Sequence, residues 1–415
     1  MTITHPREAR TATTAVFRTP ALLRMTGPAF VAAVAYVDPG NVATNITAGA
    51  RHGYLLLWVL AGANIMAMLV QYLSAKLTIA TGATLPEICA RRLRRPARLA
   101  MWAQAETVAI ATDLAEVVGG AVALHLLFGT PLVAGGLITG AVSWVMLVVQ
   151  SRRGQRRFEA VVIALLAVIL VGFVFTAFDG GVSLDGLVSG LVPGLSGTDS
   201  LFLSCGILGA TVMPHAIYLH GALLRDRHGE PRGRGRELLR ATRLDVLTAM
   251  GLAGMVNAAI LAIGAAALSP AVGASLEGAY RGLAAGLGQV PAAFFALALL
   301  ASGLAATSVG TYAGTVIAEG FLGRWSSLSM RRLATLVPAM AVLAAGAEPG
   351  RVLVISQVVL SFGIPFALWP LVMFTHRRDL MGRLVNRPVT TVCAAACASA
   401  VTVLNCALVW YETAG

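Results

Sequence analysis

The sequence predicts an all-α, polytopic membrane protein with about eleven transmembrane helices. Of its 415 residues, 57% are hydrophobic and only 12% are charged, and the mean hydropathy is +0.78. Soluble globular proteins carry roughly 25% charged residues. Apolar stretches of roughly 20 residues recur along nearly the whole chain, and each is long enough to cross a bilayer as a helix. A β-barrel would instead show short segments of alternating polarity.

Eleven segments are predicted to span the membrane within a single transmembrane domain over residues 25–415. They cover residues 28–50, 54–80, 99–126, 131–150, 158–178, 200–224, 244–268, 291–320, 333–347, 352–374 and 388–411. Residues 1–24 are polar and lack the apolar core of a signal peptide, so we interpret them as a cytoplasmic tail.

The basic residues gather in alternate connections between the spans. The tail and the segments 81–98, 151–157, 225–243, 321–332 and 375–387 hold 27 of the 31 Lys and Arg residues. Cytoplasmic loops of membrane proteins carry this excess. We therefore expect a cytoplasmic N-terminus and, with an odd number of spans, an external C-terminus. The same pattern explains the net charge of +12 without a nucleic-acid partner.

Two of the spans are expected to break at a proline. The first contains Asp38-Pro39-Gly40-Asn41, and the sixth contains Met213-Pro214-His215. Proline removes a helical hydrogen bond and clashes with the preceding turn. Broken helices at matching positions of two halves indicate an inverted-repeat transporter with a site near the midplane. The repeats would cover about 25–180 and 198–376, with 388–411 appended. The alternative is a pair of kinks that serve helix packing.

The residues around the two breaks predict a cation site. A carboxylate at the depth of Asp38 is costly and therefore functional by default. Helix C-terminal ends free backbone carbonyls, and Ala35 and Ala210 each lie three residues before a break residue. The other candidate ligands are the Asn41 amide oxygen, the Met213 thioether and, in the tenth span, Gln357. A thioether favours transition metals over Mg²⁺ and Ca²⁺.

Three acidic residues of the third span share one helix face. They are Glu106, Asp113 and Glu116, with spacings of 7 and 3. Carboxylates on a lipid-facing surface would be too costly. We expect either a proton relay or a structural ion-pair network, with Arg331 and Arg332 as candidate partners.

These motifs resemble the paired signatures of the Nramp family, in its bacterial MntH type. Tyr218-Leu219-His220 and Asp113-Leu114-Ala115-Glu116 fit as well, and the resemblance extends from about residue 25 to 411. Gly221 departs from the serine of many relatives. The resemblance implies a LeuT-type fold and alternating access. It also implies proton-coupled uptake of Mn²⁺, and of Fe²⁺, Co²⁺ or Cd²⁺, across the bacterial inner membrane, with no resident cofactor.

The resemblance also implies roles for individual residues. The metal ligands would be Asp38, Asn41, Met213 and the carbonyls of Ala35 and Ala210. In relatives, the acidic stripe and the arginine that corresponds to Arg332 resemble a proton exit route, with Asp38 as the proton acceptor. His215 would act in proton coupling, although it can also be read as a metal ligand or as a polar packing residue. Magnesium-transporting relatives lack the methionine, so Met213 indicates the transition-metal branch.

Three other functions remain as alternatives. A cation-coupled symporter of organic solutes has the same broken helices, but its pocket would favour small polar residues over a thioether. A Mg²⁺ carrier is disfavoured by Met213. A membrane enzyme is disfavoured because the chain contains no HExxH or GxSxG motif.

Overall fold

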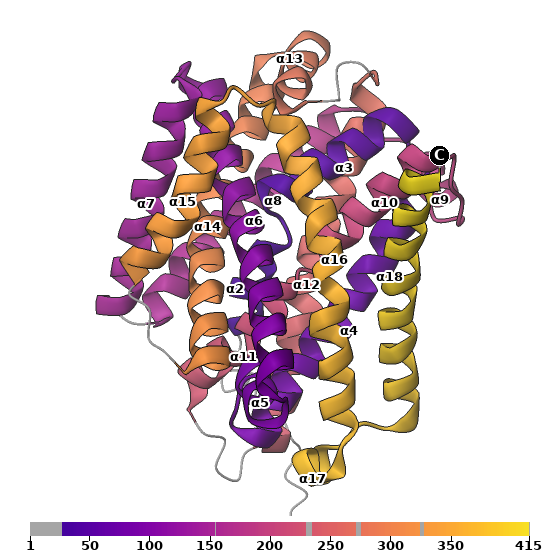
Figure 1. The fold of residues 1–415 in the computed structure, drawn as a ribbon. Helices are drawn as coiled ribbons and strands as arrows, with labels where there is room; N and C mark the ends of the chain where they lie inside the picture. Colours follow the sequence, from indigo (N-terminus) through magenta and orange to yellow (C-terminus); the bar gives the residue numbers. More distant parts are fainter. Residues whose placement is uncertain (1–26, 154, 230–234, 271–274, 324–327, 415) are drawn as a thin grey trace, which may run out of the picture.

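The computed structural model describes residues 27–153, 155–229, 235–270, 275–323 and 328–414, and it contains no strand within them. The predicted tail, 1–24, lies outside the described residues. Figure 1 shows a bundle of long helices that run between two opposite ends of the molecule.

Every predicted span corresponds to a helix or a pair of half-helices. They are α2 (Pro28–Ala35) with α3 (Pro39–His52), α4 (Leu57–Thr81), α6 (Arg95–Phe128), α7 (Leu132–Arg153), α8 (Gln155–Asp179), α10 (Thr198–Thr211) with α11 (Pro214–His228), α12 (Gly235–Ala267), α14 (Gln289–Leu322), α15 (Leu328–Ala344), α16 (Pro349–His376) and α18 (Pro388–Ala414). The shorter helices are α5 (Leu85–Arg92), α9 (Leu184–Ser189), α13 (Leu276–Gly286), α17 (Arg378–Met381) and the 3-10 turn η1 (Gly382–Leu384).

Length and hydropathy alone do not reveal all eleven spans. Within the described ranges, eight helical segments are long and apolar enough to cross a membrane, with α10 and α11 taken together as one. Shorter apolar stretches lie in α7 and α15. The halves α2 and α3 have 8 and 14 residues, so neither spans a bilayer alone. Together they form the remaining span, and the predicted fold class is confirmed.

Proline and glycine set many of the helix boundaries. Proline stands in the first turn of α3, α5, α6, α11 and α16, where a backbone N–H would have no acceptor within the helix. Gly82 and Gly129 end α4 and α6 with φ of 71° and 67°, a conformation that costs glycine little.

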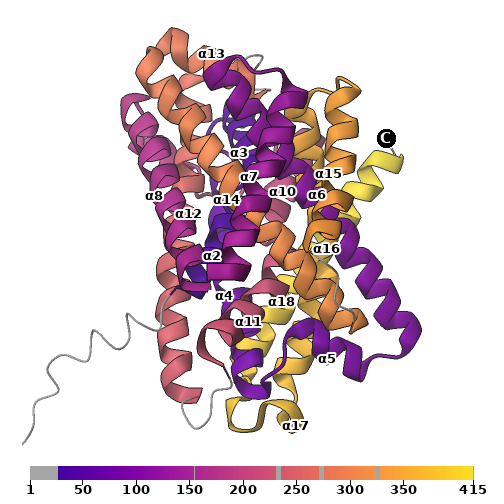
Figure 2. The ribbon, with the colours of Figure 1, turned by 90° about the vertical axis from the view of Figure 1, so that its left-hand side faces the viewer.

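The two broken helices lie together in the bundle. The half-helix α3 contacts α10, and α16 packs against both. Figures 1 and 2 show α5 and α17, which come from predicted cytoplasmic segments, at one end of the bundle and α13 at the other. This arrangement matches the predicted alternation of loops.

Candidate metal centre

Both breaks follow from the missing N–H of proline. The half-helix α2 ends at Ala35 and α3 begins at Pro39, whereas α10 ends at Thr211 and α11 begins at Pro214. A helical carbonyl accepts from the N–H four residues later. Pro39 and Pro214 cannot supply that donor, so the carbonyls of Ala35 and Ala210 lose their helical partners. These are the two carbonyls that the sequence singled out.

Asn41 joins the two breaks directly. Its Nδ2 donates to the Ala210 carbonyl at 3.1 Å and to the Tyr36 carbonyl at 2.5 Å. The Asp38 carboxylate caps α3 by accepting from the Asn41 backbone N–H at 2.7 Å, and its other oxygen accepts from Gln357 Nε2 at 3.3 Å. These side chains are completely buried. The structure thus brings Asp38, Asn41, Ala210 and Gln357 into one contiguous site.

The orientation of the Asn41 amide is one feature that the sequence did not suggest. Its nitrogen faces the Ala210 carbonyl, and its oxygen accepts from Asn45 Nδ2 at 2.5 Å. An amide oxygen has two lone pairs and can accept a second partner. Asn45 therefore orients the amide that the sequence assigned to the metal.

Glycines allow the surrounding helices to approach the site. A Cβ on Gly40 would lie 1.8 Å from Gln357 Nε2, and one on Gly209 would lie 1.8 Å from the Gln357 carbonyl oxygen. On α6, a Cβ on Gly119 would lie 1.9 Å from Pro39 Cβ. A side chain at Gly209 would push α16 away from α10, one at Gly119 would push α6 away from Pro39, and one at Gly40 would displace the Gln357 side chain.

Polar side chains of neighbouring helices satisfy the other carbonyls of the first break. Asn257 Nδ2 on α12 donates to the Tyr36 carbonyl at 2.8 Å, and Ser302 Oγ on α14 donates to the Val37 carbonyl at 2.5 Å. Sequence reasoning missed both residues. Their only signal was an amide and a hydroxyl within long apolar spans.

A second polar network leads from the first break to α11. Gln71 on α4 donates from Nε2 to the Tyr36 hydroxyl, and its Oε1 lies 2.8 Å from His220 Nδ1, from which it accepts a hydrogen bond when Nδ1 carries the proton. All three side chains are buried. This network connects the two broken helices through α4.

Met213 and His215 flank Pro214 at the second break. Met213 is fully buried between α10 and α11. His215 Nδ1 lies 3.3 Å from Thr112 Oγ1 on α6, and its buried Nε2 has no hydrogen-bond partner within the described structure. The structure therefore places His215 against the helix that carries the acidic stripe.

Two members of the acidic stripe converge, and the third lies apart. Asp113 and Glu116 are buried, and a Cβ on Gly310 of α14 would lie 2.9 Å and 2.7 Å from their respective carboxylate oxygens. Arg332 is buried as well, and its charge acts on both carboxylates through space, because none of its guanidinium nitrogens has a hydrogen-bond partner among the described residues. Glu106 lies two turns earlier on α6 and is only partly buried. Asp113, Glu116 and Arg332 are therefore buried together, and we call them the buried triad. Glu106 is the more exposed end of the predicted stripe.

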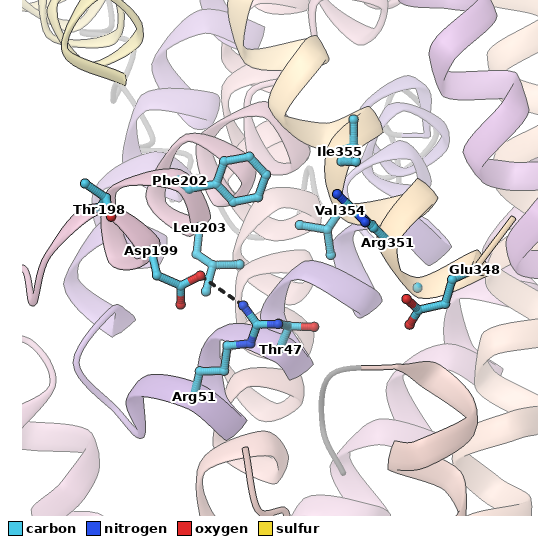
Figure 3. Close-up of a pocket in the computed structure, with 11 residues that line it drawn as sticks. Thr47, Arg51, Thr198, Asp199, Phe202, Leu203, Glu348, Arg351, Val354 and Ile355 are labelled. Carbon is cyan, nitrogen blue, oxygen red and sulfur yellow. Dashed lines mark hydrogen bonds and ion pairs between the residues drawn. The ribbon is translucent and has the colours of Figure 1, made fainter. Parts of the chain in front are cut away.

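A cavity of about 640 Å³ lies between α3, α10 and α16 (Figure 3). Arg51 Nη1 and His52 Nε2 on α3 lie 2.9 Å and 2.8 Å from the Asp199 carboxylate on α10. Arg351 of α16 and Glu348, the residue that precedes this helix, line the cavity as well. Val354, another lining residue, lies one turn before Gln357. The cavity therefore approaches the site from the end opposite α5 and α17.

The site contains few of the side chains that hold resident metals. No group of three or more His, Cys, Asp or Glu side chains is arranged to hold a metal ion in the part of the chain that the structure describes. A cation here would depend on backbone carbonyls, amides and a thioether around one carboxylate.

Comparison with known families decides the identity of the chain. The model of the family described as Natural resistance-associated macrophage protein-like, or Nramp, matches residues 29–411. The chain belongs to the Nramp family. Two relatives named divalent metal cation transporter MntH support this assignment. The protein of Mycobacterium leprae is 54% identical over 387 residues, which cover 92% of this chain and 91% of the relative. The protein of Bacillus subtilis is 44% identical over 392 residues, which cover 94% and 92%.

Solved structures agree with this Nramp assignment. A manganese transporter of Eremococcus coleocola, in complex with an aromatic bis-isothiourea compound, matches with a TM-score of 0.84 and 32% identity, over 93% of this chain and 86% of that chain. MhsT in complex with L-phenylalanine matches with a TM-score of 0.58 and 15% identity, over 91% of this chain and 98% of that chain. The second likeness shows the shared fold alone. The predicted family and the LeuT-type fold class are confirmed.

Proposed function

We propose that this Nramp protein takes up divalent transition-metal ions, with Mn²⁺ as the main substrate, together with protons across a bacterial cell membrane. The contact between Asn41 and the Ala210 carbonyl carries the proposal, because it joins two proline-broken helices beside a buried carboxylate. The relatives named divalent metal cation transporter and manganese transporter support the same substrate class.

The geometry supports a cation that replaces the Asn41 N–H between the two breaks. The Asn41 side-chain amide now donates hydrogen bonds to the Ala210 and Tyr36 carbonyl oxygens. A divalent ion between the breaks would attract the carbonyl oxygens more strongly than an N–H does. It would also attract the Asp38 carboxylate. The proposed ligands are the Asp38 carboxylate, the Asn41 amide oxygen after a rotation of the amide that turns this oxygen toward the breaks, the Met213 sulfur and the carbonyls of Ala35 and Ala210, with Gln357 as an additional oxygen ligand.

The chemistry of this ligand set supports a transition metal. Ca²⁺ prefers six to eight oxygen ligands, often from several carboxylates, and Mg²⁺ retains several waters in an octahedral shell. Here Asp38 is the only carboxylate in the proposed set, and a sulfur occupies one position. A soft sulfur gives more to transition metals than to these hard cations.

The breaks also support alternating access. Each half-helix lacks continuous hydrogen bonding to its partner, so α3 and α10 can tilt relative to α2 and α11. The ion pair between Arg51 and Asp199 ties the far ends of α3 and α10 together. The basic segments support a cytoplasmic position for the α5 and α17 end, and with that orientation the cavity in Figure 3 would open outward. The repeats would cover about 25–180 and 198–376, with the C-terminus outside.

A proton route from the site toward the cytoplasm is supported by the buried triad. Gly119 contacts Pro39, and Glu116 lies one turn before Gly119 on α6. Asp113 lies beside Glu116, and Arg332 interacts with both. Two adjacent buried carboxyls are costly when both are ionised, so such a pair holds and passes a proton. Asp38 would release its proton to this pair when the metal binds. His215, against Thr112 of the same helix, would assist.

Uptake of Mn²⁺ into proteoliposomes under an inward proton gradient tests the proposal. Asp38→Ala should abolish uptake because it removes the only formal charge of the ligand set. The matched control is Glu277→Gln, which removes an exposed carboxylate on α13 that pairs with Arg281. The control should transport like the wild type. Near-normal Mn²⁺ uptake by Asp38→Ala would refute the site. Uptake of amino acids without metal uptake by the wild type would favour the organic-solute symporter.

A further inference from the structure

A second cavity lies at the end of the bundle that carries the basic loops. Its volume is about 540 Å³, and it lies between α4, α12, η1 and the start of α18. The lining residues are Met68, Leu69, Tyr72, Lys76, Leu239, Arg243, Val246, Leu247, Arg383, Leu384, Val385, Arg387 and Thr390. None of these belongs to the proposed transport site.

The polar part of this cavity is strongly cationic. It contains Lys76, Arg243, Arg383 and Arg387, and the lining includes no Asp or Glu. Within the described ranges, none of these four side chains forms an ion pair with a carboxylate. Four unneutralised cations around one hollow repel one another and favour an anionic occupant.

Lys76 is fixed at the inner wall of the cavity. It is only 7% exposed, and its Nζ donates to Asn386 Oδ1 at 2.7 Å and lies 5.9 Å from the centre of the Tyr72 ring. Both partners are neutral, so they orient the ammonium group without cancelling its charge. The ammonium group of Lys76 is therefore already positioned to bind an anion in the cavity.

The other wall of the cavity is apolar and continues onto the outer surface of the bundle. On α4, Met68 and Leu69 lie about two turns from Lys76, toward the middle of the span. On α12, Val246 and Leu247 follow Arg243 in the same direction, and Leu247 is 47% exposed. The cavity is therefore basic at the loop end and apolar toward the bilayer interior on two helices.

We propose that this cavity binds an anionic membrane phospholipid, with its phosphate headgroup among the four cations and its acyl chains along α4 and α12. Basic pockets between transmembrane helices at the cytoplasmic face suit anionic headgroups. A free phosphate ion would use the cations but would gain nothing from the apolar wall. The polarity gradient therefore favours a lipid as the source of the phosphate.

Native mass spectrometry of the detergent-purified protein tests this site with phosphatidylglycerol and phosphatidylcholine of identical acyl chains. The double variant Arg383→Gln/Arg387→Gln should bind phosphatidylglycerol roughly 25-fold more weakly, at about five-fold for each arginine lost. The charge-preserving variant Arg383→Lys/Arg387→Lys should retain most of the binding. The matched control is Arg91→Gln/Arg94→Gln, which removes two exposed arginines at the same end of the protein but outside the cavity. It should bind like the wild type.

Three results would overturn the proposal. They are equal binding of phosphatidylcholine and phosphatidylglycerol, an equal loss in the control variant, and displacement of the lipid by an equal concentration of inorganic phosphate. The last result would indicate a site for free anions. Arg243→Gln gives an independent test from α12, with an expected loss of about five-fold. Thermal unfolding without lipid verifies that each variant is folded.

Discussion

Replacement of Gly209 by alanine should disrupt both the packing and the transport activity of this protein. Gly209 lies in α10, two residues before its end, where α16 crosses closest to it. An added Cβ would lie 1.8 Å from the Gln357 carbonyl oxygen and 2.8 Å from the Ser361 backbone nitrogen. Both obstacles belong to the backbone of α16, so no change of rotamer relieves the contact.

The expected magnitude follows from these distances. Ordinary van der Waals contact begins at 3.4 Å, so α16 must retreat by about 1.6 Å from α10. Overpacking of this kind lowers the free energy of unfolding by about 3 kcal/mol, the upper end of its usual range. Alanine has a higher helix propensity than glycine, which adds back about 1 kcal/mol. The expected net loss of stability is therefore about 2 kcal/mol. The same shift carries Gln357 away from Asp38, which it now contacts at 3.3 Å.

Thermal unfolding in detergent and Mn²⁺ uptake in proteoliposomes measure the two effects. Gly251→Ala on α12 is the matched control, because nothing lies within 4 Å of its added Cβ. It should unfold at or slightly above the wild-type temperature and transport normally. Gly40→Ala is an informative intermediate, since the three atoms nearest its added Cβ all belong to the Gln357 side chain and none to a backbone. It should lose less stability but should still weaken uptake. A Gly209→Ala protein with wild-type unfolding and wild-type uptake would refute the reasoning.

Three further changes probe the metal site, the buried triad and the outer ion pair. Met213→Ala should keep substantial Mn²⁺ uptake, lose Cd²⁺ uptake and become sensitive to Ca²⁺, because water replaces a soft ligand. Competition of Ca²⁺ against Mn²⁺ uptake measures this change. Unchanged selectivity in both Met213→Ala and Met213→Leu would show that Met213 is a packing residue. Glu116→Gln should reduce proton flux more than Mn²⁺ flux, and a proportional fall of both, with lost metal affinity, would count against a separate proton route. Asp199→Asn should change stability by less than about 1 kcal/mol, because the pair with Arg51 is exposed. It should nevertheless speed the modification of a cysteine placed at Thr47 by an impermeant thiol reagent, and an unchanged rate would show that the pair does not restrain α3 and α10.

Local patterns in the sequence were sufficient for the all-helical membrane class and the position of both breaks, because each depends on neighbouring residues only. The count of eleven spans also needed the alternation of basic segments, since length and hydropathy alone do not reveal all of them. An apolar stretch of about 20 residues becomes a spanning helix wherever it lies, and a proline removes the donor for the carbonyl four residues earlier in any helix. For the same reason, Ala35 and Ala210 were identifiable as freed carbonyls before any contact was known. The sequence could therefore nominate residues beside the breaks, and their role as metal ligands stays a prediction.

Only the tertiary structure decided which of these groups meet. Asn41 and Ala210 are 169 residues apart, and Asp38 and Gln357 are 319 apart. Their contacts depend on how far each helix is rotated and how closely glycines let it approach, which no local pattern encodes. The same rotation buries Asp113 and Glu116 beside Arg332 and leaves Glu106 partly exposed, although all three share a helix face in the sequence.

The basic cavity illustrates the same division. The sequence showed that cations concentrate in the segments predicted to be cytoplasmic, because that bias follows from loop composition. It did not show that Lys76, Arg243 and Arg387, from three separate segments, surround one hollow. The folded chain brought these charges together because the long-range packing of α4, α12 and α18, and not the local sequence, fixes the distances between them.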